Sequence, residues 1–412
     1  MKKILLVIFD GLADLPIPEL KGQTPLEAAK TPNLDKLAEK GVLGTQNAMA
    51  PGEYPTSEEA HFEILGYDHK KDLPGRGVLE ALGIGAELEK GDLALRVNFA
   101  TVDDSLSVID PRAGNIKDNK SYTRQIAEER IGPFTFKLYS GLAHRAALVI
   151  SGPPVSKEIY HHSTIVTDTD PHKAANHRGG TKVIRPQAIN DTPEAKMTAD
   201  ALWDYQLLTH KKLDQYIENK VRKRQGLMPA NFLLTRGAGF IKKVENFYEK
   251  FGLNAACVAG APLYKGIARY FGMDVIEVPG ATGGIDTDVN AKINESLNLL
   301  RSGYDFVFLH IKGADVVAEE DGDFKAKTKF YERADEAFSR LLDFEGILCV
   351  TGDHATPCIL SDHSPDPVPI MVIGGKSDET AEFNEKTAKE GSLGHLKGSE
   401  IMPKLMKEAH YI

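Results

Sequence analysis

Acidic and histidine side chains follow several apolar runs of this chain, at positions where a metal ion could be bound. Asp10 comes directly after one run, Asp315 lies a few residues past another, and Asp353-His354 follow a third. His363 is close enough in sequence to fold back over the same edge. Carboxylates and imidazoles together suit a divalent transition ion such as zinc or manganese. Any one acid is more readily explained as a helix cap or turn former, so the prediction depends on their convergence.

Ser57 stands where a proline-bounded loop gives way to a helical pattern. One interpretation is a helix N-cap, a position that serine fills well. The other is a nucleophile at a helix N-terminus, where backbone N–H groups and the helix dipole favour a phosphate anion. A serine hydroxyl is a weak nucleophile at neutral pH and would need a metal ion to hold it as the alkoxide. The local sequence leaves both interpretations open.

The elements that must position these residues are buried strands separated by helices. Residues 4–9 are continuously apolar, which predicts a strand buried on both faces, as in a parallel sheet covered by helices. Three further runs have the same character: 306–309, 347–350 and 368–373. Helical patterns occupy 34–40, after Thr31-Pro32, and 325–342. This alternation predicts an α/β fold with a mostly parallel sheet, whose ligands collect at the carboxyl ends of the strands.

Length and composition fit a large globular protein. The chain has 412 residues, 42% hydrophobic and 26% charged, so we expect one large domain or two and exclude disorder, collagen and coiled coil. A net charge of −9 has the wrong sign for binding nucleic acid. Three separated cysteines fit a reducing compartment, and the first apolar run is too short for a signal peptide or membrane span. We therefore expect a cytoplasmic protein with no nucleic-acid or membrane partner.

The middle of the chain has a different pattern and implies a second unit. In residues 93–99 the large apolar side chains fall at every second position, which predicts a strand with one face buried. A long amphipathic helix starts near Thr192 and ends on a basic run before Gly226. Its inward residues are predicted to be Met197, Leu202, Tyr205, Leu213 and Ile217. Four histidines with no standard ligand spacing predict a polar loop: His161, His162, His172 and His177.

Short motifs recur in a fixed order along nearly the whole chain. They lie at 9–11, 30–37, 57–68, 75–77, 96–101, 112–114, 144–145, 168–172, 236–239, 263–269, 279–283, 352–357 and 366–369. In these motifs the chain resembles the archaeal-type 2,3-bisphosphoglycerate-independent phosphoglycerate mutases of the alkaline phosphatase superfamily. The resemblance implies an alkaline-phosphatase-like α/β core, residues 1–85 and 236–412, whose mostly parallel sheet is flanked by helices. It also implies a smaller inserted α+β domain, residues 86–235, that closes over the substrate.

The resemblance further implies an isomerase of glycolysis and gluconeogenesis that interconverts 3-phosphoglycerate and 2-phosphoglycerate through a phosphoserine at Ser57. No 2,3-bisphosphoglycerate would be needed, but two divalent metal ions would. Manganese is the preferred assignment, while magnesium, zinc and cobalt stay open, as does a homo-oligomer. By position, one metal would be held by Asp10, Ser57, Asp353 and His354, and the other by Asp315 and His363. The basic positions that would grip the substrate are Arg145, Arg236 and Lys265.

The chain departs from the family pattern in two places. The family has Asp, three residues and then His, whereas here Glu319 occupies the expected histidine position and one residue is added before Gly322. Glu319, or Glu320 if the extra residue shifts the register, would then be a ligand and would favour manganese or magnesium. After the nucleophile, Glu58 and Glu59 replace an aspartate and a small neutral residue, and two carboxylates would repel a phosphate dianion.

These departures keep two alternative functions open. One is a metal-dependent phosphatase or phosphoesterase of the same superfamily that acts on another small phosphate ester. The other is a non-catalytic relative that binds a phosphorylated metabolite. Release of free phosphate would separate the phosphatase from the mutase, and failure to bind metal would favour the non-catalytic relative.

Overall fold

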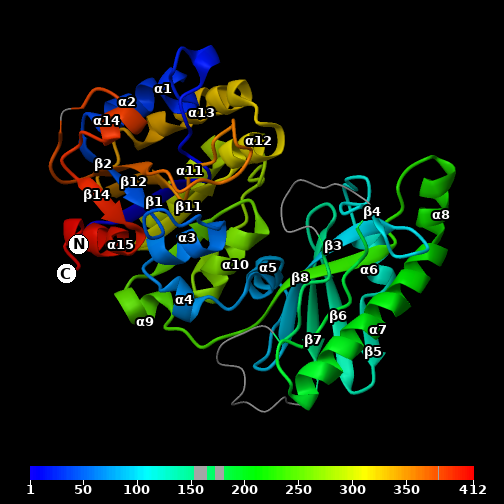
Figure 1. Cartoon of the computed structure of the whole chain (residues 1–412). Coiled ribbons are helices and arrows are strands. Elements are labelled where there is room, and N and C mark those ends of the chain that lie inside the picture. The colour runs from blue at the N-terminus through cyan, green and yellow to red at the C-terminus, as the bar shows by residue number, and fades with distance from the viewer. Residues whose placement is uncertain (153–164, 172–180, 379) are drawn as a thin grey trace. The chain divides into compact units, whose positions relative to one another are not determined.

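The computed structural model describes residues 1–152, 165–171, 181–378 and 380–412 (Figure 1). The chain folds into two compact units, Met1–Leu73 with Val244–Ile412, and Pro74–Lys243. The second unit begins earlier and ends later than the predicted 86–235, because α5 (Arg76–Gly83) and the whole of β8 (Phe232–Phe240) pack with its sheet. The predicted histidine loop lies outside the described residues: His161, His162, His172 and His177.

The first unit consists of an eight-stranded sheet with helices (Figure 1). Its strands are β1 (Ile4–Phe9), β2 (Gly41–Asn47), β9 (Ala255–Val258), β10 (Asp274–Val275), β11 (Phe306–Ile311), β12 (Ile347–Gly352), β13 (Val368–Ile373) and β14 (Gly394–Lys397). Its helices are α1 (Pro25–Ala28), α2 (Pro32–Ala38), α3 (Ser57–Ile64), α4 (His69–Asp72), α9 (Phe247–Phe251), α10 (Pro262–Tyr270), α11 (Val289–Arg301), α12 (Gly313–Asp321), α13 (Phe324–Phe338), α14 (Glu385–Ala388) and α15 (Gly398–Glu408), with short 3₁₀ turns at Pro18–Leu20 and Ser339–Leu341.

The strand order is β10-β9-β11-β1-β12-β13-β2-β14. Only β13 runs against its neighbours, so the predicted mostly parallel sheet is confirmed, although the run at 368–373 is its antiparallel strand. In the register of the centre, Phe9 lies level with Ile311 on one side and Gly352 on the other. The carboxyl ends of β11, β1 and β12 therefore meet at one edge of the sheet.

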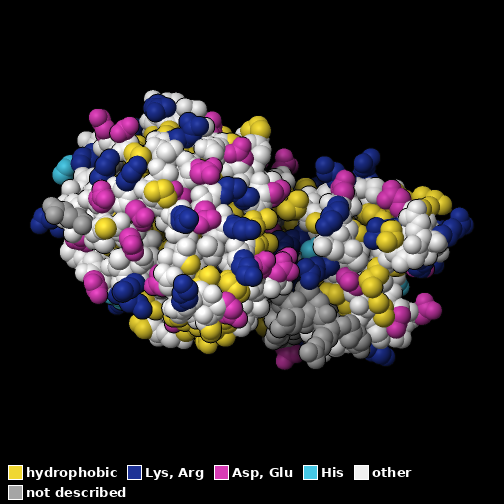
Figure 2. All heavy atoms as spheres, turned by 90° about the horizontal axis from the view of Figure 1, so that it is seen from above, with side chains coloured by type: hydrophobic (Ala, Val, Ile, Leu, Met, Phe, Trp, Pro, Cys, Tyr) yellow, Lys and Arg dark blue, Asp and Glu magenta, His cyan; other side chains and the backbone are white. Residues whose placement is uncertain are grey.

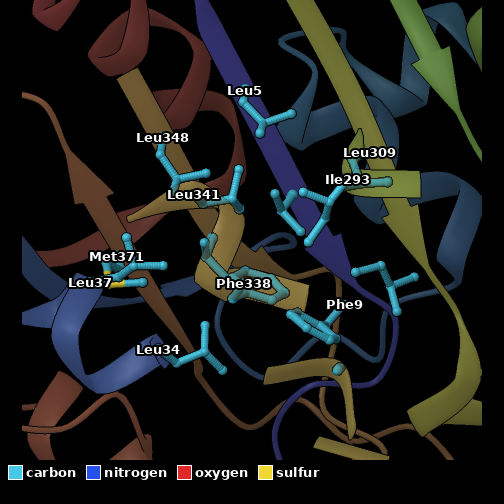
Figure 3. Packing of buried hydrophobic residues seen from close by; sticks show 14 of the residues in the cluster. Leu5, Phe9, Leu34, Leu37, Ile293, Leu309, Phe338, Leu341, Leu348 and Met371 are labelled. Atoms are coloured by element: carbon cyan, nitrogen blue, oxygen red, sulfur yellow. The ribbon is translucent and has the colours of Figure 1, made fainter. Parts of the chain in front are cut away.

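One face of this sheet is covered by α2, α11 and α13 (Figure 3). Leu5 and Phe9 of β1 point into this layer, and the Phe9 ring stacks on Phe338 with ring centroids 5.6 Å apart. The predicted helices at 34–40 and 325–342 are confirmed as α2 and α13, with the 3₁₀ turn continuing the second. All three cysteines are buried free thiols: Cys257, Cys349 and Cys358.

The N-terminus of α2 is capped from another helix. Thr31 occupies the N-cap position, but its side chain makes no capping hydrogen bond. Instead, the buried Asp335 of α13 accepts hydrogen bonds from the backbone N–H groups of Asn33 (3.0 Å) and Leu34 (2.7 Å). A carboxylate at this position satisfies N–H groups that have no partner inside the helix. Asp335 therefore ties α2 to α13.

Glu385, at the start of α14, is a buried carboxyl that makes stability depend on pH. It accepts hydrogen bonds from the Thr24 hydroxyl (2.8 Å) and from the Asp14 backbone N–H (3.2 Å), but burial raises its pKa to about 7. The unfolded chain loses this proton near pH 4.3, roughly. The stabilising contribution is therefore complete below about pH 4 and is lost as the pH rises to about 7, a change of up to about 3 kcal/mol.

We accordingly expect Glu385→Gln to be more stable than the natural protein at pH 8 and about equal to it at pH 4, because the neutral amide oxygen can accept from the Asp14 N–H and the amide NH2 can donate to the Thr24 hydroxyl oxygen, without a buried charge. Urea unfolding at the two pH values measures this. Glu390→Gln, at an exposed position nearby, is the control and should leave the pH dependence unchanged. Parallel pH curves for Glu385→Gln and the natural protein would contradict the assignment.

The second unit is built on an antiparallel sheet. Its strands are β3 (Leu93–Val102), β4 (Val108–Asp110), β5 (Glu128–Ile131), β6 (Phe134–Ser140), β7 (Arg145–Ser151) and β8, and its helices are α5, α6 (Lys120–Gln125), α7 (Pro193–Gln215) and α8 (Ile217–Arg224). The main order is β4-β3-β7-β6-β5, with β8 also paired to β3. The predicted one-sided burial of residues 93–99 is wrong, since every residue of β3 is buried. One face packs against α7 and the other against α5.

The predicted long helix is two helices. Tyr216 has an extended backbone conformation and separates α7 from α8. Leu202, Tyr205 and Leu213 are buried as predicted, whereas Met197 and Ile217 are exposed. The break turns Ile217 away from the continuous stripe that the prediction assumed. None of the helices in the described ranges is both long enough and apolar enough to cross a lipid bilayer.

Charged side chains of both signs are mixed over the face of the molecule drawn in Figure 2. The net charge of −9 is therefore not gathered into one acidic patch on that face.

Candidate active site

Ser57 is the first residue of α3. Thr56 is the N-cap: its hydroxyl accepts from the Glu59 N–H, and the Glu59 carboxylate bonds back to the Thr56 backbone. The N-cap interpretation of Ser57 is therefore wrong, because Thr56 and Glu59 form a complete capping box one residue earlier. The Ser57 hydroxyl is largely buried and lies 3.3 Å from Nε2 of His354. Ser57 thus remains available at a helix N-terminus, next to an imidazole.

Asp10, Asp353 and His354 form one group of possible metal ligands at the carboxyl ends of β1 and β12. His354 Nε2 lies 3.4 Å from Asp10 Oδ1 and 3.2 Å from Asp353 Oδ2. Both carboxylate oxygens are buried, and neither has a hydrogen-bond partner among the described residues. Buried oxygens without a donor are costly unless a cation or water binds them, so this donor set fits a divalent metal ion.

Asp315, His354 and His363 form a second group, which overlaps the first. His363 Nε2 lies 3.6 Å from Asp315 Oδ1, while its Nδ1 donates to the Pro55 carbonyl (2.9 Å). The His354 and His363 rings stack with their centroids 3.6 Å apart. Sequence reasoning assigned His354 to one metal only, whereas its Nε2 or Nδ1 lies within reach of both groups.

Thr356 sets the orientation of the His354 ring. Its hydroxyl donates to Asp315 Oδ1 (2.9 Å) and accepts from His354 Nδ1 (3.1 Å). Nδ1 therefore carries the proton, and the Nε2 lone pair faces Ser57 and the carboxylates. Burial and the neighbouring His363 lower the pKa of His354 to about 3, which keeps the imidazole in the neutral form that binds metals.

The carboxyl groups of the site are strongly perturbed. Burial raises the pKa of Asp353, and the negative charges of Asp10 and Asp315 raise it further. Burial acts in the same direction on Asp10, but the Lys312 ammonium and the nearby histidines outweigh it and hold the pKa well below its ordinary value. Such crowding of acids marks a site that stabilises added positive charge.

Lys312 and Tyr264 belong to this site, although sequence reasoning did not single them out. The Lys312 ammonium lies 2.9 Å from Asp10 Oδ2 and 2.6 Å from Asp315 Oδ2. The Tyr264 hydroxyl donates to Asp10 and its ring stacks on His310. Lys312 could have been found by the same signal as Asp10, since it directly follows a buried strand of the same sheet.

His61 and His310 also lie beside the acids, where a buried histidine can have a structural hydrogen-bonding role. His61 Nδ1 donates to the Ser57 carbonyl (2.7 Å), which supports that role for His61. His310 Nε2 lies 3.5 Å from Asp10 Oδ2, beyond a close hydrogen bond. Burial lowers the pKa of His61 to about 4 and that of His310 to about 3, so both are neutral.

Four arginines gather on one face of the second unit. Arg96 of β3 is in register with Arg236 of β8, and Arg145 of β7 pairs with the residue two positions further along β3. Arg76 joins them from α5. Two acids lie among the arginines: Glu80, whose Oε1 is 3.8 Å from Arg96 Nε, and Asp170, whose charge acts on Arg236. Burial and the charges of Arg76 and Arg236 lower the pKa of Arg96.

This arginine cluster has spare capacity for an anion. Within the part of the chain that the structure describes, the buried Nε atoms of Arg96 and Arg145 have no hydrogen-bond partner. Four guanidinium groups beside the two carboxylates of Glu80 and Asp170 leave an excess of positive charge, which a ligand with a carboxylate or phosphate would neutralise. Sequence reasoning found Arg145 and Arg236 but missed Arg76 and Arg96, although both lie in the family motifs.

Comparison with known proteins decides the family. The model of the metalloenzyme superfamily matches residues 2–408. A 2,3-bisphosphoglycerate-independent phosphoglycerate mutase 1 from Methanocaldococcus jannaschii is 40% identical, over 98% of this chain and 96% of its own. The chain belongs to this family. A second such mutase, from Thermococcus kodakarensis, is 39% identical over 98% of this chain and 97% of its own.

Solved structures confirm the α/β fold of this phosphoglycerate mutase family member. The cofactor-independent phosphoglycerate mutase from Thermoplasma acidophilum has a TM-score of 0.69 and 34% identity, covering 99% of this chain and 100% of that one. The PH0037 protein from Pyrococcus horikoshii has a TM-score of 0.81 and 35% identity, covering 100% and 98%. The predicted resemblance is confirmed, and with it membership of a family of isomerases.

The position in which this mutase family member departs from its motif lies on α12. Glu319 follows Asp315 by one helical turn and is half-buried, whereas Glu320 is exposed. Among the described residues Glu319 makes no hydrogen bond or ion pair, and burial together with the charge of Asp315 raises its pKa. Its carboxylate is not among the tightly grouped ligand atoms. A change of rotamer would be needed for it to reach a metal held by Asp315.

Lys265, the third predicted substrate-binding residue, belongs to the first unit, whereas the arginine cluster belongs to the second. Lys265 is in α10 of the first unit, and its ammonium forms an ion pair with Glu277 (2.6 Å).

Another histidine and acid group, Glu63, Asp68 and His69, lies elsewhere in this unit. His69 Nδ1 already bonds to Glu63 (2.7 Å), which explains that group without a metal.

Proposed function

We propose that this chain is a phosphoglycerate mutase of glycolysis and gluconeogenesis that interconverts 3-phosphoglycerate and 2-phosphoglycerate through a phosphoserine at Ser57. The observation that carries the proposal is the Ser57 hydroxyl, at the N-terminus of α3 and 3.3 Å from the histidine shared by two groups of metal ligands. The printed names of the relatives support the same reaction. No 2,3-bisphosphoglycerate is required, because the serine itself carries the phosphoryl group.

Two divalent metal ions complete the proposed site, and manganese is our assignment. Asp10, Ser57, Asp353 and His354 would hold one ion, while Asp315, Glu319 and His363 would hold the other. The buried carboxylate oxygens without donors fit such ions. When bound, two cations lower the pKa of the serine hydroxyl and neutralise charge on the phosphoryl oxygens.

The chain's own residues would bind the phosphoryl group and the substrate and hold the carboxylates in place. The positive end of the α3 dipole favours the phosphoryl group on Ser57. Lys312 bridges Asp10 and Asp315 and so keeps the two carboxylates at a fixed spacing. We propose that Arg145 and Arg236, joined by Arg76 and Arg96, bind the carboxylate and phosphate of the substrate, and that Lys265 adds a further positive charge.

The second unit is proposed to close over the substrate. A mutase must retain its glycerate while the phosphoserine persists, because water attacking first would release phosphate. Closure by a domain that carries the substrate-binding arginines would exclude that water. A phosphatase on another small ester is the second candidate, because the Glu319 replacement changes the family's metal ligand.

Phosphorus NMR with 3-phosphoglycerate and manganese tests the proposal. We expect growth of the 2-phosphoglycerate signal to equilibrium with little free phosphate. Free phosphate without 2-phosphoglycerate would favour the phosphatase. An unchanged spectrum would contradict both activities and favour a phosphometabolite-binding relative.

The Glu319 carboxylate makes the metal preference testable. Glu319→Gln is expected to weaken the binding of the second manganese ion by about 10-fold or more, since it removes an anionic ligand. Glu319→His should shift preference from manganese toward zinc, because imidazole is the softer ligand. Competitive titration of Mn²⁺ and Zn²⁺, followed by electron paramagnetic resonance, measures both effects.

Glu320→Gln is the matched control for this prediction, since Glu320 is the exposed neighbour. It should bind manganese like the natural protein. Loss of affinity in Glu320→Gln and not in Glu319→Gln would show that the extra residue shifts the ligand register.

A further inference from the structure

A fully buried ion pair lies behind the candidate metal site and contacts neither of its predicted metal-ligand groups directly. Lys327, near the start of α13, places its ammonium 2.9 Å from Asp14 Oδ2, and both side chains are almost completely buried. Lys327 also donates to the Thr356 carbonyl (2.8 Å) and the Ala13 carbonyl (3.3 Å). Its three N–H donors are therefore matched by three acceptors.

These acceptors come from the two segments that carry metal ligands. We define the β1 loop as residues 10–15 and the β12 loop as residues 353–358. Asp14 and Ala13 belong to the β1 loop, which also carries Asp10. Thr356 belongs to the β12 loop, which also carries Asp353 and His354. Lys327 thus binds both loops at once, although it lies in neither.

Asp14, in the β1 loop, is itself hydrogen-bonded to the β12 loop. Its carboxylate accepts a hydrogen bond from the Cys358 N–H at 3.2 Å to each oxygen, and from the Leu15 N–H at 2.8 Å. The Thr356 N–H donates to the Ala13 carbonyl at 3.0 Å. The two loops are therefore joined by backbone and side-chain bonds that converge on the Asp14–Lys327 pair.

Thr356 connects the Asp14–Lys327 pair to the candidate metal site. Its backbone carbonyl is held by Lys327, while its hydroxyl holds His354 Nδ1 and Asp315 Oδ1. The fit is close: Gly11 has a φ of +68°, and a Cβ atom there would lie 2.6 Å from the Thr356 hydroxyl oxygen. A shift of Thr356 would thus change the direction of the His354 lone pair and the position of Asp315.

We propose that Asp14 and Lys327 are positioning residues that hold the two ligand-bearing loops in register for metal binding. The inference rests on the metal site of the proposed function and deepens it. Burying an ion pair carries a large desolvation cost, and a well-packed apolar pair of similar volume is often at least as stable. Stability alone therefore does not explain why a lysine and an aspartate are buried here. The three hydrogen bonds by which Lys327 holds the two loops do explain it.

The test measures manganese affinity of the metal-free full chain by electron paramagnetic resonance, without any activity assay. Lys327→Met keeps most of the side-chain volume and removes the three bonds. We expect it to weaken Mn²⁺ binding by about 10-fold to 100-fold, the range seen when residues behind metal ligands are changed. The double variant Asp14→Asn with Lys327→Met removes the unpaired charge that could unfold the single variant, and it should bind Mn²⁺ as weakly.

Asp335→Asn is the matched control, because Asp335 lies on the same helix, is equally buried and holds α2 instead of the ligand loops. It should lower the unfolding midpoint but bind Mn²⁺ within about 3-fold of the natural affinity. Natural affinity in the folded double variant would overturn the inference, as would an equal loss in Asp335→Asn. If the natural protein itself binds no Mn²⁺, the metal site of the proposed function fails instead.

Discussion

Replacing Ser57 by alanine is expected to lower the rate of phosphoglycerate interconversion by about 10⁴-fold or more, because the group that would carry the phosphoryl is removed. The Ser57 hydroxyl is the only part of the side chain lost, and its contact with His354 Nε2 is 3.3 Å long. The fold should be retained, since Thr56 and Glu59, and not Ser57, cap α3. The phosphorus NMR time course with 3-phosphoglycerate and manganese measures the effect.

Ser296→Ala is the matched control for this experiment. Ser296 is also a buried serine of the first unit, but its hydroxyl donates to the Lys292 carbonyl within its own helix. Its replacement should leave the rate unchanged. Interconversion in Ser57→Ala at a rate close to that of the natural protein would refute the phosphoserine, while leaving the metal site untested by that result alone.

The second large effect is expected from His354→Asn. Asparagine keeps a hydrogen-bond donor near the position of Nδ1, so that the contact with Thr356 can persist, but it removes Nε2. Because Nε2 faces Asp10 and Asp353, we expect the binding of the manganese ion held with these two carboxylates to weaken by about 100-fold or more, beyond the effect of changing a residue behind the ligands. Titration with Mn²⁺ gives the number of ions bound and their affinities.

His69→Asn is the control, since His69 lies in a histidine and acid group that already explains its own hydrogen bond. Two ions should bind to that variant with natural affinity. Loss of both ions from His354→Asn would contradict the assignment of His354 to a single metal.

Much of the first unit can be predicted from local patterns. A continuously apolar run such as 4–9 indicates a strand buried on both faces, and the carboxyl ends of parallel strands meet at one edge. Asp10, Asp353 and His354 directly follow two such strands, so their convergence depends on topology alone. The structure places their possible ligand atoms together for this reason.

Choices between neighbouring residues were harder to predict. Thr56 and Ser57 are both good N-cap residues, and the capping box with Glu59 selects Thr56. The alternation in 93–99 indicates one buried face, but Ala94 packs with residues of α5 on the other face, where Arg96 and Asn98 are buried too. Local hydrophobicity does not reveal how many partners a strand will have.

The order of strands and helices, and the acids and histidines at the strand ends, follow from the amino-acid sequence, because burial and backbone geometry act over a few residues. The contacts that complete the site have another origin. Lys312 meets Asp10 across 302 positions and Lys327 meets Asp14 across 313. Lysine is common and ordinarily solvated, so its residue type gives no signal by itself, even for Lys312, which directly follows a buried strand. Only the packing of α12 and α13 against the strand ends places these ammonium groups where a carboxylate compensates their lost hydration.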